Sequence, residues 1–579
     1  MVNVKNLFGM AVMATALVGC ASNDDLTPNG NDNAGKAGEA YASFKINLPT
    51  VSGTRASGTG IPDGTPDFKP GTDDEYAVND ATLLLFKKET EGSKTVYKFQ
   101  ETVPLGNMEP WTSSSTEGIT TTAKLTAKLT QAEVGSNKGY YALIVLNNNE
   151  GTDAKITYPN VGDKYSDWSK KAITITSTSN NYLKHDKGFF MANAPKYVAG
   201  GTPETLVEIK NVYASKQQAE NSTATIVYVE RGLAKVSLAT GSDNKHVDIK
   251  GGNYDGDKVD IKGWTLDVTN TKTFPVHVTD GLWKDIWMKT VSTPATHGAT
   301  MDRFHDTKLT EFQRVYWGAD PNYSKDFTSV TACEGEFTMA TKANFKTGED
   351  AKKAQYCLEN TFDIKHMVQG QTTRVLFSAK YQPKNFAENE TFYKMGNSSQ
   401  LWKESDVIAQ IRAKAQEVLK VPASEVTVIL TGTDLAKAGI HLITKANVKH
   451  GTAEISDEDI TAINTKLGFK AASGTDPMVG LSTYVGGVSY YIARIKHFNE
   501  LTPWNAGDAT YNDSNIDWLG RYGVLRNNWY ELSVNSVSGP GYPDVPEVNP
   551  TDPDDVNDQY INVEVKILDW AKRSQSIDL

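Results

Sequence analysis

The sequence predicts a mainly β protein with two consecutive antiparallel β-sandwich domains, a few inserted helices and a separate C-terminal strand. Three observations favour this fold class. Some short segments alternate apolar and polar residues, others are continuously apolar, and Thr, Ser, Asn and Gly fill the connections. The length of 579 residues is enough for several domains of roughly 100–200 residues each.

The strands follow from these patterns along the chain. Phe44, Ile46 and Leu48 alternate with polar neighbours, which is typical of a half-buried strand. Residues 81–86 and 140–146 are continuous apolar runs, so we expect strands that are covered on both faces. Further β-branched and aromatic stretches lie at residues 225–238, 263–268, 373–381 and 484–498.

One helix is clear from the spacing of its apolar residues. They fall on a single helical face: Val407, Ile408, Ile411, Ala415, Val418 and Leu419. Ser405 and Asp406 precede this face as candidate N-terminal caps. We therefore expect a helix that ends near residue 419.

The charge balance argues against a nucleic-acid-binding protein. Lys and Arg number 59 and Asp and Glu number 70, which gives a formal net charge of −11. A phosphate-binding protein normally carries a basic excess or a basic stripe, and this sequence has neither. Residues 1–55 hold four basic and four acidic residues, so the rest of the chain keeps the whole charge of −11.

The first residues have the layout of an export signal. Lys5 precedes an apolar stretch, residues 7–18, that is too short to span a bilayer. Residues 17–20, Leu-Val-Gly-Cys, resemble the bacterial lipobox, which implies cleavage before Cys20 and lipid attachment to its thiol. The alternative is a plain secretory signal followed by a chance cysteine. We expect an exported protein with a lipid anchor at Cys20.

Two further cysteines leave their pairing open. Only Cys333 and Cys357 follow Cys20, and two thiols cannot make the disulfide framework of a chain this long. They either form one bridge or are small buried side chains. The sequence does not give the distance between their backbones, so both readings stand.

The sequence contains no familiar catalytic motif. The HExxH zinc site, the GxSxG nucleophile elbow and the Walker loop are all missing. Asp255, Asp257 and Asp260 do not follow the order of an EF-hand loop and are better read as a solvated turn. We expect no enzyme, no metal and no cofactor. A hydrolase stays open as an alternative, because paired carboxylates leave no trace in one sequence.

A candidate processing site follows the first predicted strand. Arg55 stands in a run of small residues, 52–60, where a protease can seat the backbone in its cleft. The bond between Arg55 and Ala56 is therefore a candidate for cleavage. An ordinary loop arginine is the alternative.

The C-terminal region joins a stiff segment to a strand. Five prolines within residues 540–553 favour an extended segment that could reach roughly 40 Å. The pattern beyond it alternates apolar and polar residues, with one step out of phase as at a bulge. Its apolar members are Ile561, Val563, Val565, Ile567, Leu568 and Trp570. This predicts a strand on a long tether, and a last strand that returns to its own domain is the alternative.

Several segments together resemble the Bacteroidales type V fimbrial subunits, in the expected order over nearly the whole exported chain. They are VERGLAKV (229–236), ENT (359–361), YVGGVSYY (484–491), IKHF (495–498), YGVLRNNWY (522–530), GYP (541–543) and WAKRSQSIDL (570–579). The most similar type is the shaft subunit of the Porphyromonas minor fimbrium and its gut relatives. The departures are Asn528, where many relatives have histidine, and a longer C-terminal domain.

The resemblance implies a lipoprotein precursor that an arginine-specific protease cuts after its first strand. The cut between Arg55 and Ala56 would release the strand that carries Phe44, Ile46 and Leu48. The C-terminal donor strand of an identical neighbour would then fill the groove, with Ile561, Val563, Val565, Ile567, Leu568 and Trp570 as its plugs. The implied divisions are a signal peptide (1–19), a propeptide with the removable strand (20–55), an N-terminal sandwich (56–240), a C-terminal sandwich (241–539) and a tether with the donor strand (540–579).

The expected function is the structural shaft of a cell-surface fimbrium, reached through a lipidated periplasmic precursor at the outer membrane. Anchor and tip subunits would be further partners. A shaft is favoured because, by the resemblance, anchors lack the cut and tips lack the trailing strand. The alternatives are an anchor or tip subunit and a non-polymerising surface lipoprotein that binds glycan or a host protein.

Overall fold

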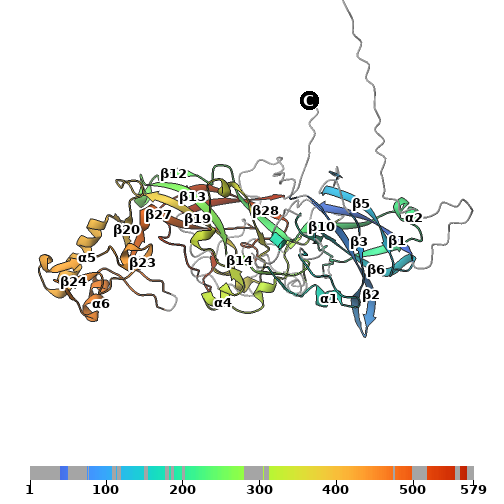
Figure 1. Cartoon of the computed structure of the whole chain (residues 1–579), viewed down its shortest axis with the longest axis horizontal. Coiled ribbons are helices and arrows are strands. Elements are labelled where there is room, and N and C mark those ends of the chain that lie inside the picture. Colours follow the sequence, from blue (N-terminus) through green and yellow to red (C-terminus); the bar gives the residue numbers. More distant parts are fainter. Residues whose placement is uncertain are drawn as a thin grey trace, which may run out of the picture.

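The computed structural model describes residues 39–49, 75, 77–106, 112–113, 119–148, 154–175, 181–183, 188–198, 203–279, 304–305, 312–473, 476–498, 518–548, 550–554 and 561–569. The molecule is elongated, with a curled sheet from the first part of the chain at one end and a helix-containing insert at the other (Figure 1). The predicted mainly β fold is confirmed. Among the described residues, no helix is long and apolar enough to cross a membrane.

The N-terminal sheet curls around one hydrophobic core. Its strands in spatial order are β3 (Lys94–Pro104), β2 (Ala81–Glu91), β6 (Gly135–Leu146), β8 (Met191–Asn193), β10 (Thr225–Arg231), β1 (Ala40–Pro49), β5 (Ile119–Leu129) and β4 (Thr112–Ser113), with β9 (Val207–Val212) paired to β6. Both halves of the sheet contribute to the core: Leu83 and Ile144 come from one half, and Phe44 and Val227 from the other.

The two continuous apolar runs are indeed buried on both faces. They form neighbouring strands, because β2 pairs with β6 in antiparallel register. Leu83 and Leu85 point into the core that β1 shares, whereas Leu84 and Phe86 pack into a second cluster with Trp168. Alternate residues of one strand thus serve two cores, which is why the run shows no polar alternation.

The chain passes from one sheet to the next at Gly232. The stretch 225–238 forms two strands, β10 in the N-terminal sheet and β11 (Leu233–Leu238) in another. A Cβ at Gly232 would lie 2.1 Å from the Tyr182 hydroxyl oxygen and 3.0 Å from a Phe190 ring carbon. Only glycine fits at this crossing, so the backbone can pass directly between the two sheets.

The second sandwich packs two sheets face to face. The first has the order β18 (Gln355–Leu358), β11, β28 (Asn528–Val537) and β29 (Ile561–Asp569). The second has β12 (His246–Asp248), β13 (Lys258–Asp267), β19 (Arg374–Gln382) and β27 (Val488–Arg494), with β17 (Lys346–Thr347) paired to β13. Tyr530 and Leu532 of the first sheet meet Trp264 and Phe377 of the second in one cluster.

Two strand pairs depart from the antiparallel pattern. β1 runs parallel to β10, and β11 runs parallel to β28. Parallel neighbours need long connections, and here most of each domain lies between the two partners. Period-2 alternation gives the faces of a strand but not the direction of its neighbours, so the sequence did not predict these pairs.

A small α/β insert extends the second sandwich. It contains α5 (Glu404–Leu419) and α6 (Asp457–Lys466), and these helices lie at the left end of the molecule (Figure 1). The insert's strands are β20 (Phe392–Met395), β21 (Leu401–Trp402), β22 (Val426–Val428), β23 (Gly439–His441), β24 (Val448–His450), β25 (Ala453–Glu454) and β26 (Leu481–Tyr484). The helix predicted near residues 407–419 is confirmed, but its N-cap is Lys403, and Ser405 and Asp406 lie in the first turn.

The remaining elements are short. The helices are α1 (Tyr165–Trp168), α2 (Lys216–Asn221) and α4 (Val330–Glu334). The two-residue strands pair as β7 (Ile173–Thr174) with β15 (Lys272–Thr273) and β14 (Thr269–Asn270) with β16 (Phe337–Thr338). Single 3-10 turns lie at Asn181–Leu183, Gly252–Tyr254, Pro321–Tyr323, Lys342–Asn344, Gly348–Lys352, Ile364–His366, Ala423–Glu425, Asp434–Ala436 and Val485–Gly487.

Candidate strand-exchange site

β1 lies inside the N-terminal sheet, with a hydrogen-bonded neighbour on each edge. It pairs in parallel with β10, from Phe44 opposite Thr225 to Asn47 opposite Tyr228. On its other edge it pairs with β5 in antiparallel register, beginning with Ala40 opposite Leu129. The first strand of the described chain is therefore not an edge strand, and from Phe44 to Asn47 it separates β10 from β5.

The inward face of β1 is entirely buried. Its five members are Ala40, Ala42, Phe44, Ile46 and Leu48, each no more than 2% exposed. The predicted residues Phe44, Ile46 and Leu48 thus do fill the N-terminal core, together with two alanines that the prediction left out. Fully burying these three larger side chains stabilises the domain by about 5–9 kcal/mol before ordering costs.

The outward face of β1 is partly covered: Tyr41 and Lys45 are half-buried, and the polar residues Ser43 and Asn47 are buried. Ser43 is 3% exposed and Asn47 is 1% exposed. The Thr122 hydroxyl donates to Asn47 Oδ1 at 2.7 Å. Helix α2, which begins after its N-cap Ser215, contacts both β1 and β5. A polar face that should meet water therefore lies partly beneath a short helical cover.

Hydrogen bonds to backbone carbonyls hold the segment around α2 against β1 and β5. The amide of Tyr41 donates to the Tyr213 carbonyl at 2.8 Å, and the amide of Tyr213 donates back at 2.8 Å. Lys124 of β5 donates from its Nζ to the carbonyl of Glu220 in α2 at 2.7 Å. The segment between β9 and β10 thus crosses over the strand that it covers.

Loss of β1 would leave a defined groove. The backbone groups of β10 and β5 that face it would be unpaired, and the core would be open to water. A strand with apolar residues at every second position could restore both the ladders and the core. The groove is therefore specific for an extended segment with period-2 alternation.

β29 is placed differently from β1. It pairs in antiparallel register with β28, from Asn528 opposite Asp569 to Val537 opposite Ile561. Among the described strands it has no second neighbour, so it lies at the edge of its sheet. Val563 packs partly buried against the core of the second sandwich. The last strand thus returns to its own domain, which is the alternative that the sequence left open.

The proline-rich segment before β29 is docked onto the second sandwich. The amides of Tyr490 and Tyr542 exchange hydrogen bonds with each other's carbonyls, and Arg374 donates to the Pro546 carbonyl at 3.0 Å. Asp554 is fully buried, where it accepts from the Thr372 hydroxyl at 2.6 Å and lies 3.0 Å from Arg494. In this structure residues 542, 546 and 554 are bound to the second sandwich, whereas the sequence predicted a tether from residue 540.

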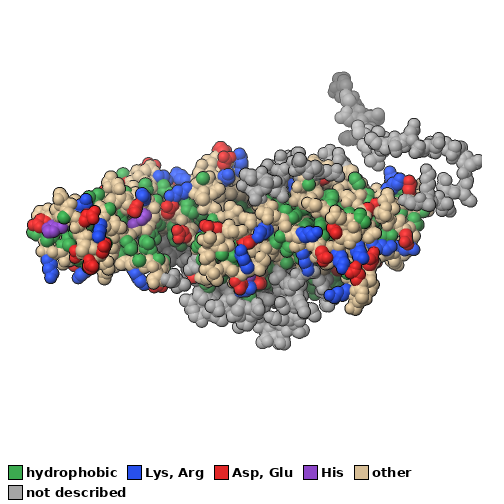
Figure 2. Space-filling view, turned by 60° about the horizontal axis from the view of Figure 1, so that its bottom comes forward, with side chains coloured by type: hydrophobic (Ala, Val, Ile, Leu, Met, Phe, Trp, Pro, Cys, Tyr) green, Lys and Arg blue, Asp and Glu red, His purple; other side chains and the backbone are tan. Residues whose placement is uncertain are grey.

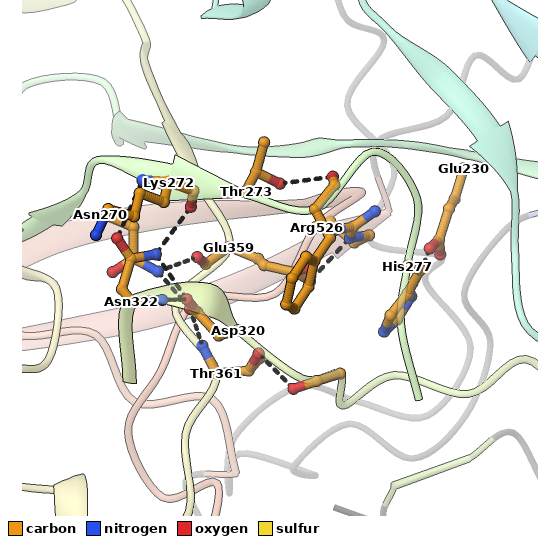
Figure 3. A network of polar contacts seen from close by, with 12 residues as sticks. Glu230, Asn270, Lys272, Thr273, His277, Asp320, Asn322, Glu359, Thr361 and Arg526 are labelled. Carbon is orange, nitrogen blue, oxygen red and sulfur yellow. Dashed lines mark hydrogen bonds and ion pairs between the residues drawn. The ribbon is translucent and has the colours of Figure 1, made fainter. Parts of the chain in front are cut away.

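Glu230, the last residue but one of β10, holds a buried ion network between the two sandwiches (Figure 3). Its carboxylate lies 2.6 Å from His277 Nδ1 and accepts from Arg314 Nε at 2.6 Å. Burial alone would raise the pKa of Glu230, but Arg314 and His277 outweigh it and lower that pKa to about 2. Arg526 pairs with Glu359 close by, and all these charges are buried.

The next residues of the same motif anchor β11. Arg231 donates to the Asn527 side chain at 3.2 Å and to the carbonyl of Glu75 at 3.1 Å. Lys235 pairs with the Glu75 carboxylate at 2.8 Å and lies 3.5 Å from the centre of the Trp529 ring. The VER-x-x-AKV residues therefore fix the junction between the sheets rather than line a ligand site.

Other predicted site residues lie outside the described part of the chain, namely Cys20, Arg55, Ala56 and Trp570. For the remaining predicted plugs of the last strand (Ile561, Val565, Ile567 and Leu568), the structure describes the backbone register alone.

The two cysteines do not form the bridge that the sequence left open. Both are free thiols. Cys333 packs in a cluster with Phe327 and Phe337, whereas Cys357 belongs to the core of the second sandwich. Burial raises the pKa of Cys333 to about 11 and that of Cys357 to about 12. Both side chains therefore behave as small apolar groups.

Helix α2 and the contacts of Glu75 and Asp554 were not predicted from the sequence. Ser215 accepts from the amide of Gln218, a cap that marks the start of α2 and could have been read from the Ser-Lys-Gln-Gln pattern. The hydrogen bond from Arg231 to Glu75 spans 156 residues and the one from Thr372 to Asp554 spans 182, and no local pattern signals them.

The C-terminal region is similar to one known protein family. Residues 482–576 match the family of the major fimbrial subunit protein type IV, Fimbrillin, C-terminal. This span contains β27, β28 and β29. No curated protein matches the chain.

Solved structures with distant similarity include a fimbrilin from Porphyromonas gingivalis, with 13% identity and a TM-score of 0.33, covering 92% of this chain and 99% of that one. A candidate cell adhesion protein from Parabacteroides distasonis shows 10% identity and a TM-score of 0.35, with coverage of 92% and 99%. Another from Bacteroides eggerthii shows 12% identity and a TM-score of 0.33, with coverage of 93% and 98%.

Proposed function

We propose that the protein is a shaft subunit of a surface fimbrium of the Bacteroidales type V kind, a proposal that the match of residues 482–576 to the C-terminal region of fimbrillin supports. The chain would be polymerised by strand exchange. In each joint, β29 of one subunit would take the place of β1 in the next.

One observation carries this proposal, namely the position of β1 between β10 and β5. A strand at the start of the chain that completes a sheet on both edges can be separated from its domain by cutting one connection. The domain then lacks a central strand, and a strand from another molecule is the only group that restores both ladders. The contact joins unlike surfaces, so it extends into a filament instead of closing.

The pattern of β29 suits the groove. Ile561, Val563, Val565 and Ile567 repeat at every second position, as do Ala42, Phe44, Ile46 and Leu48 in β1. In this structure β29 forms one hydrogen-bonded ladder, with β28. In the groove it would form two ladders, one with β10 and one with β5. Each net hydrogen bond is worth about 0.5–1.5 kcal/mol, so exchange is favourable once the groove is empty.

The anchor at Asp554 sets the length of the moving arm. Residues up to 554 would stay on their own domain, because Asp554 is held by Thr372 and Arg494. The 25 residues from 555 to 579 remain, and such a segment spans at most about 80–90 Å when fully extended. That reach is sufficient to enter a neighbouring subunit.

Maturation would control the timing of assembly. Lipid at Cys20 would hold the precursor at the membrane, and an arginine-specific protease would cut between Arg55 and Ala56. Until then β1 fills the groove and blocks exchange. The buried inward face of β1 and the partial cover of its outward face support this order, since a strand held in this way leaves slowly while it is still attached.

Cleavage by an arginine-specific protease tests the proposal directly. The full precursor should give ladders of polymer on gels run without boiling, and N-terminal sequencing of the product should begin at Ala56. Arg55→Ala should remain monomeric. The matched control Arg412→Ala removes a half-buried arginine of the insert and should polymerise normally. Ladders from Arg55→Ala would move the cut elsewhere.

Deletion of residues 555–579 removes the donor strand β29 and keeps the groove that accepts a strand, so it tests the two roles separately. The truncated protein should fold and be cut, and it should accept β29 from another subunit but offer none. A mixture with the full-length chain should therefore give short polymers that end at the truncated subunit. Long ladders from the truncated protein alone would contradict the donor role of β29.

The pairing of β29 with β28 of its own domain favours a second candidate function. With β1 in the groove and β29 on its own sheet, the described structure has no open joint. A non-polymerising surface protein that binds glycan or a host protein would have this arrangement permanently. Unchanged monomer after complete cleavage at Arg55 would support it.

A further inference from the structure

An open cavity lies beside the N-terminal sheet, and none of the described residues that line it belongs to β1. Its volume is about 450 Å³, within the range of small-molecule sites. The wall is built by β3, β6, α1 and the segments 203–206 and 277–279. In Figure 1, β3, β6 and α1 all lie at the N-terminal end of the molecule, and contacts between α1 and β3 hold one side of the wall.

The wall has three half-buried tyrosines, Tyr97, Tyr141 and Tyr165. Tyr97 and Tyr141 meet edge to face with ring centres 4.8 Å apart, and Tyr165 meets Phe86 edge to face at 5.5 Å. These contacts fix the ring planes. Burial raises the pKa of Tyr97 and of Tyr141, so both phenols stay neutral, and the two hydroxyls hydrogen-bond to each other. As a pair they can still donate to a ligand and accept from it.

The rest of the wall is rich in hydroxyl groups and rigid. Thr95, Ser166, Ser169, Thr205 and Thr279 line the cavity. The Thr205 hydroxyl donates to the His277 carbonyl at 3.4 Å. The amides of Lys196 and Glu204 exchange hydrogen bonds with each other's carbonyls at 2.8 and 2.9 Å, which ties the 203–206 segment to its neighbour. The polar groups are therefore preorganised.

The charge of the wall restricts the ligand. Neither lysine nor arginine is among the described residues that line the cavity, and Glu204 lies at it with an exposed side chain. Glu204 and the nearby Glu208 both act on the phenols of Tyr97 and Tyr141. Phosphate, carboxylate and other anions would be repelled. On the face seen in Figure 2, basic and acidic side chains are interspersed.

We propose that this cavity binds a neutral saccharide. A pyranose has an apolar face of C–H groups that stacks on a flat ring, and a rim of hydroxyls that both donate and accept. Rigid tyrosines with neutral phenols offer both kinds of contact from the same side chain. The hydroxyls around them complete the match, and Glu204 excludes sugars that carry a carboxylate. The site is independent of strand exchange, because none of its residues belongs to β1, β5, β10 or β29.

Saturation-transfer NMR on the full chain tests the proposal, with lactose, N,N′-diacetylchitobiose and 3′-sialyllactose as probes. At least one neutral disaccharide should bind saturably, and 3′-sialyllactose should bind at least tenfold more weakly than lactose. Tyr97→Ala and Tyr165→Ala should each weaken neutral binding at least tenfold, whereas Tyr97→Phe should keep most of it. Tyr542→Ala, a half-buried tyrosine of the second sandwich, is the matched control and should bind as the wild type does.

Glu204→Gln provides a readout that does not depend on removing a ring. Its side chain is exposed, so folding should be unaffected, and the discrimination against 3′-sialyllactose should fall while lactose binding stays. The proposal is overturned if neither neutral probe binds at about 10 mM, or if binding is unchanged in both alanine variants. Binding of tetramethylammonium without any saccharide would identify an aromatic cage for cations instead.

Discussion

The first and the last described strands of this protein are held in opposite ways. β1 has a partner on each edge, an apolar core on one face and α2 on the other. β29 has one partner and lies at the edge of its sheet. Both carry the same period-2 pattern, so the pattern alone does not decide how firmly a strand is held. The difference lies in the neighbours, and it fits a strand that waits for a cut and a strand that is ready to move.

The largest effect should come from the core side of β1. Phe44→Ala should lower the free energy of unfolding of the N-terminal domain by about 3–5 kcal/mol, because it empties a fully buried site. Lys45→Ala, on the outward face of the same strand, should change it by no more than about 0.5 kcal/mol. Urea unfolding, monitored through hydrogen exchange in β5 and β10, measures the change in the free energy of unfolding for both variants. Equal effects would show that β1 is not held by its core contacts.

The ion network at the end of β10 should give the next effect, and it depends on pH. A Glu230 pKa lowered from 4.5 to about 2 contributes about 3 kcal/mol of stability above pH 5, and this is lost as pH falls towards 2. Glu230→Gln should remove this part of the acid sensitivity. It should also cost about 3 kcal/mol at pH 7, because Arg314 and His277 lose their partner. Parallel acid-unfolding curves for the variant and the wild type would contradict this assignment.

A smaller loss of stability should follow when the anchor at Asp554 is weakened, and it should leave the strands other than β29 unchanged. Asp554→Asn keeps the shape but loses the charged partner of Arg494, at a cost of about 2 kcal/mol. Hydrogen exchange should become faster in β29 and stay unchanged in β1. Faster exchange in β1 as well would show that the two strands are coupled, which the comparison excludes.

The smallest effect should come from β29. Val563→Ala should cost about 1 kcal/mol or less, since the side chain is partly buried at a sheet edge. The same variant should slow polymer formation after cleavage at Arg55, because Val563 would be fully buried in the groove. Thermal unfolding gives the first value and ladder formation gives the second. A cost as large as that of Phe44→Ala would remove the contrast between the two strands.

The sequence predicted what is local in this comparison. The inward face of β1 was readable because apolar residues occupy every second position, and α5 because its apolar residues share one face. α6 was missed, although Ser456 and the acidic first turn after it are a helix start.

What could not be read depends on contacts between distant residues. The break of 225–238 into two strands is caused by Tyr182 and Phe190 next to Gly232. The docking of the proline-rich segment depends on Thr372 and Arg494, more than fifty residues upstream of Asp554. Strand patterns also do not say which strand is central, and so the cover over β1 was not foreseen.

The crossing at Gly232 has a mechanical consequence. β10, which borders the groove, continues through one glycine into β11, and β11 lies beside β28, the present partner of β29. In a fibre of the proposed kind, tension that arrives at one joint can pass along a continuous backbone to the other sheet without crossing the packed boundary between the sandwiches. Because the ladder bonds lie across the strands, such a pull loads them together in shear. The fibre can then stay intact under tension, even if the two domains of a subunit tilt against each other.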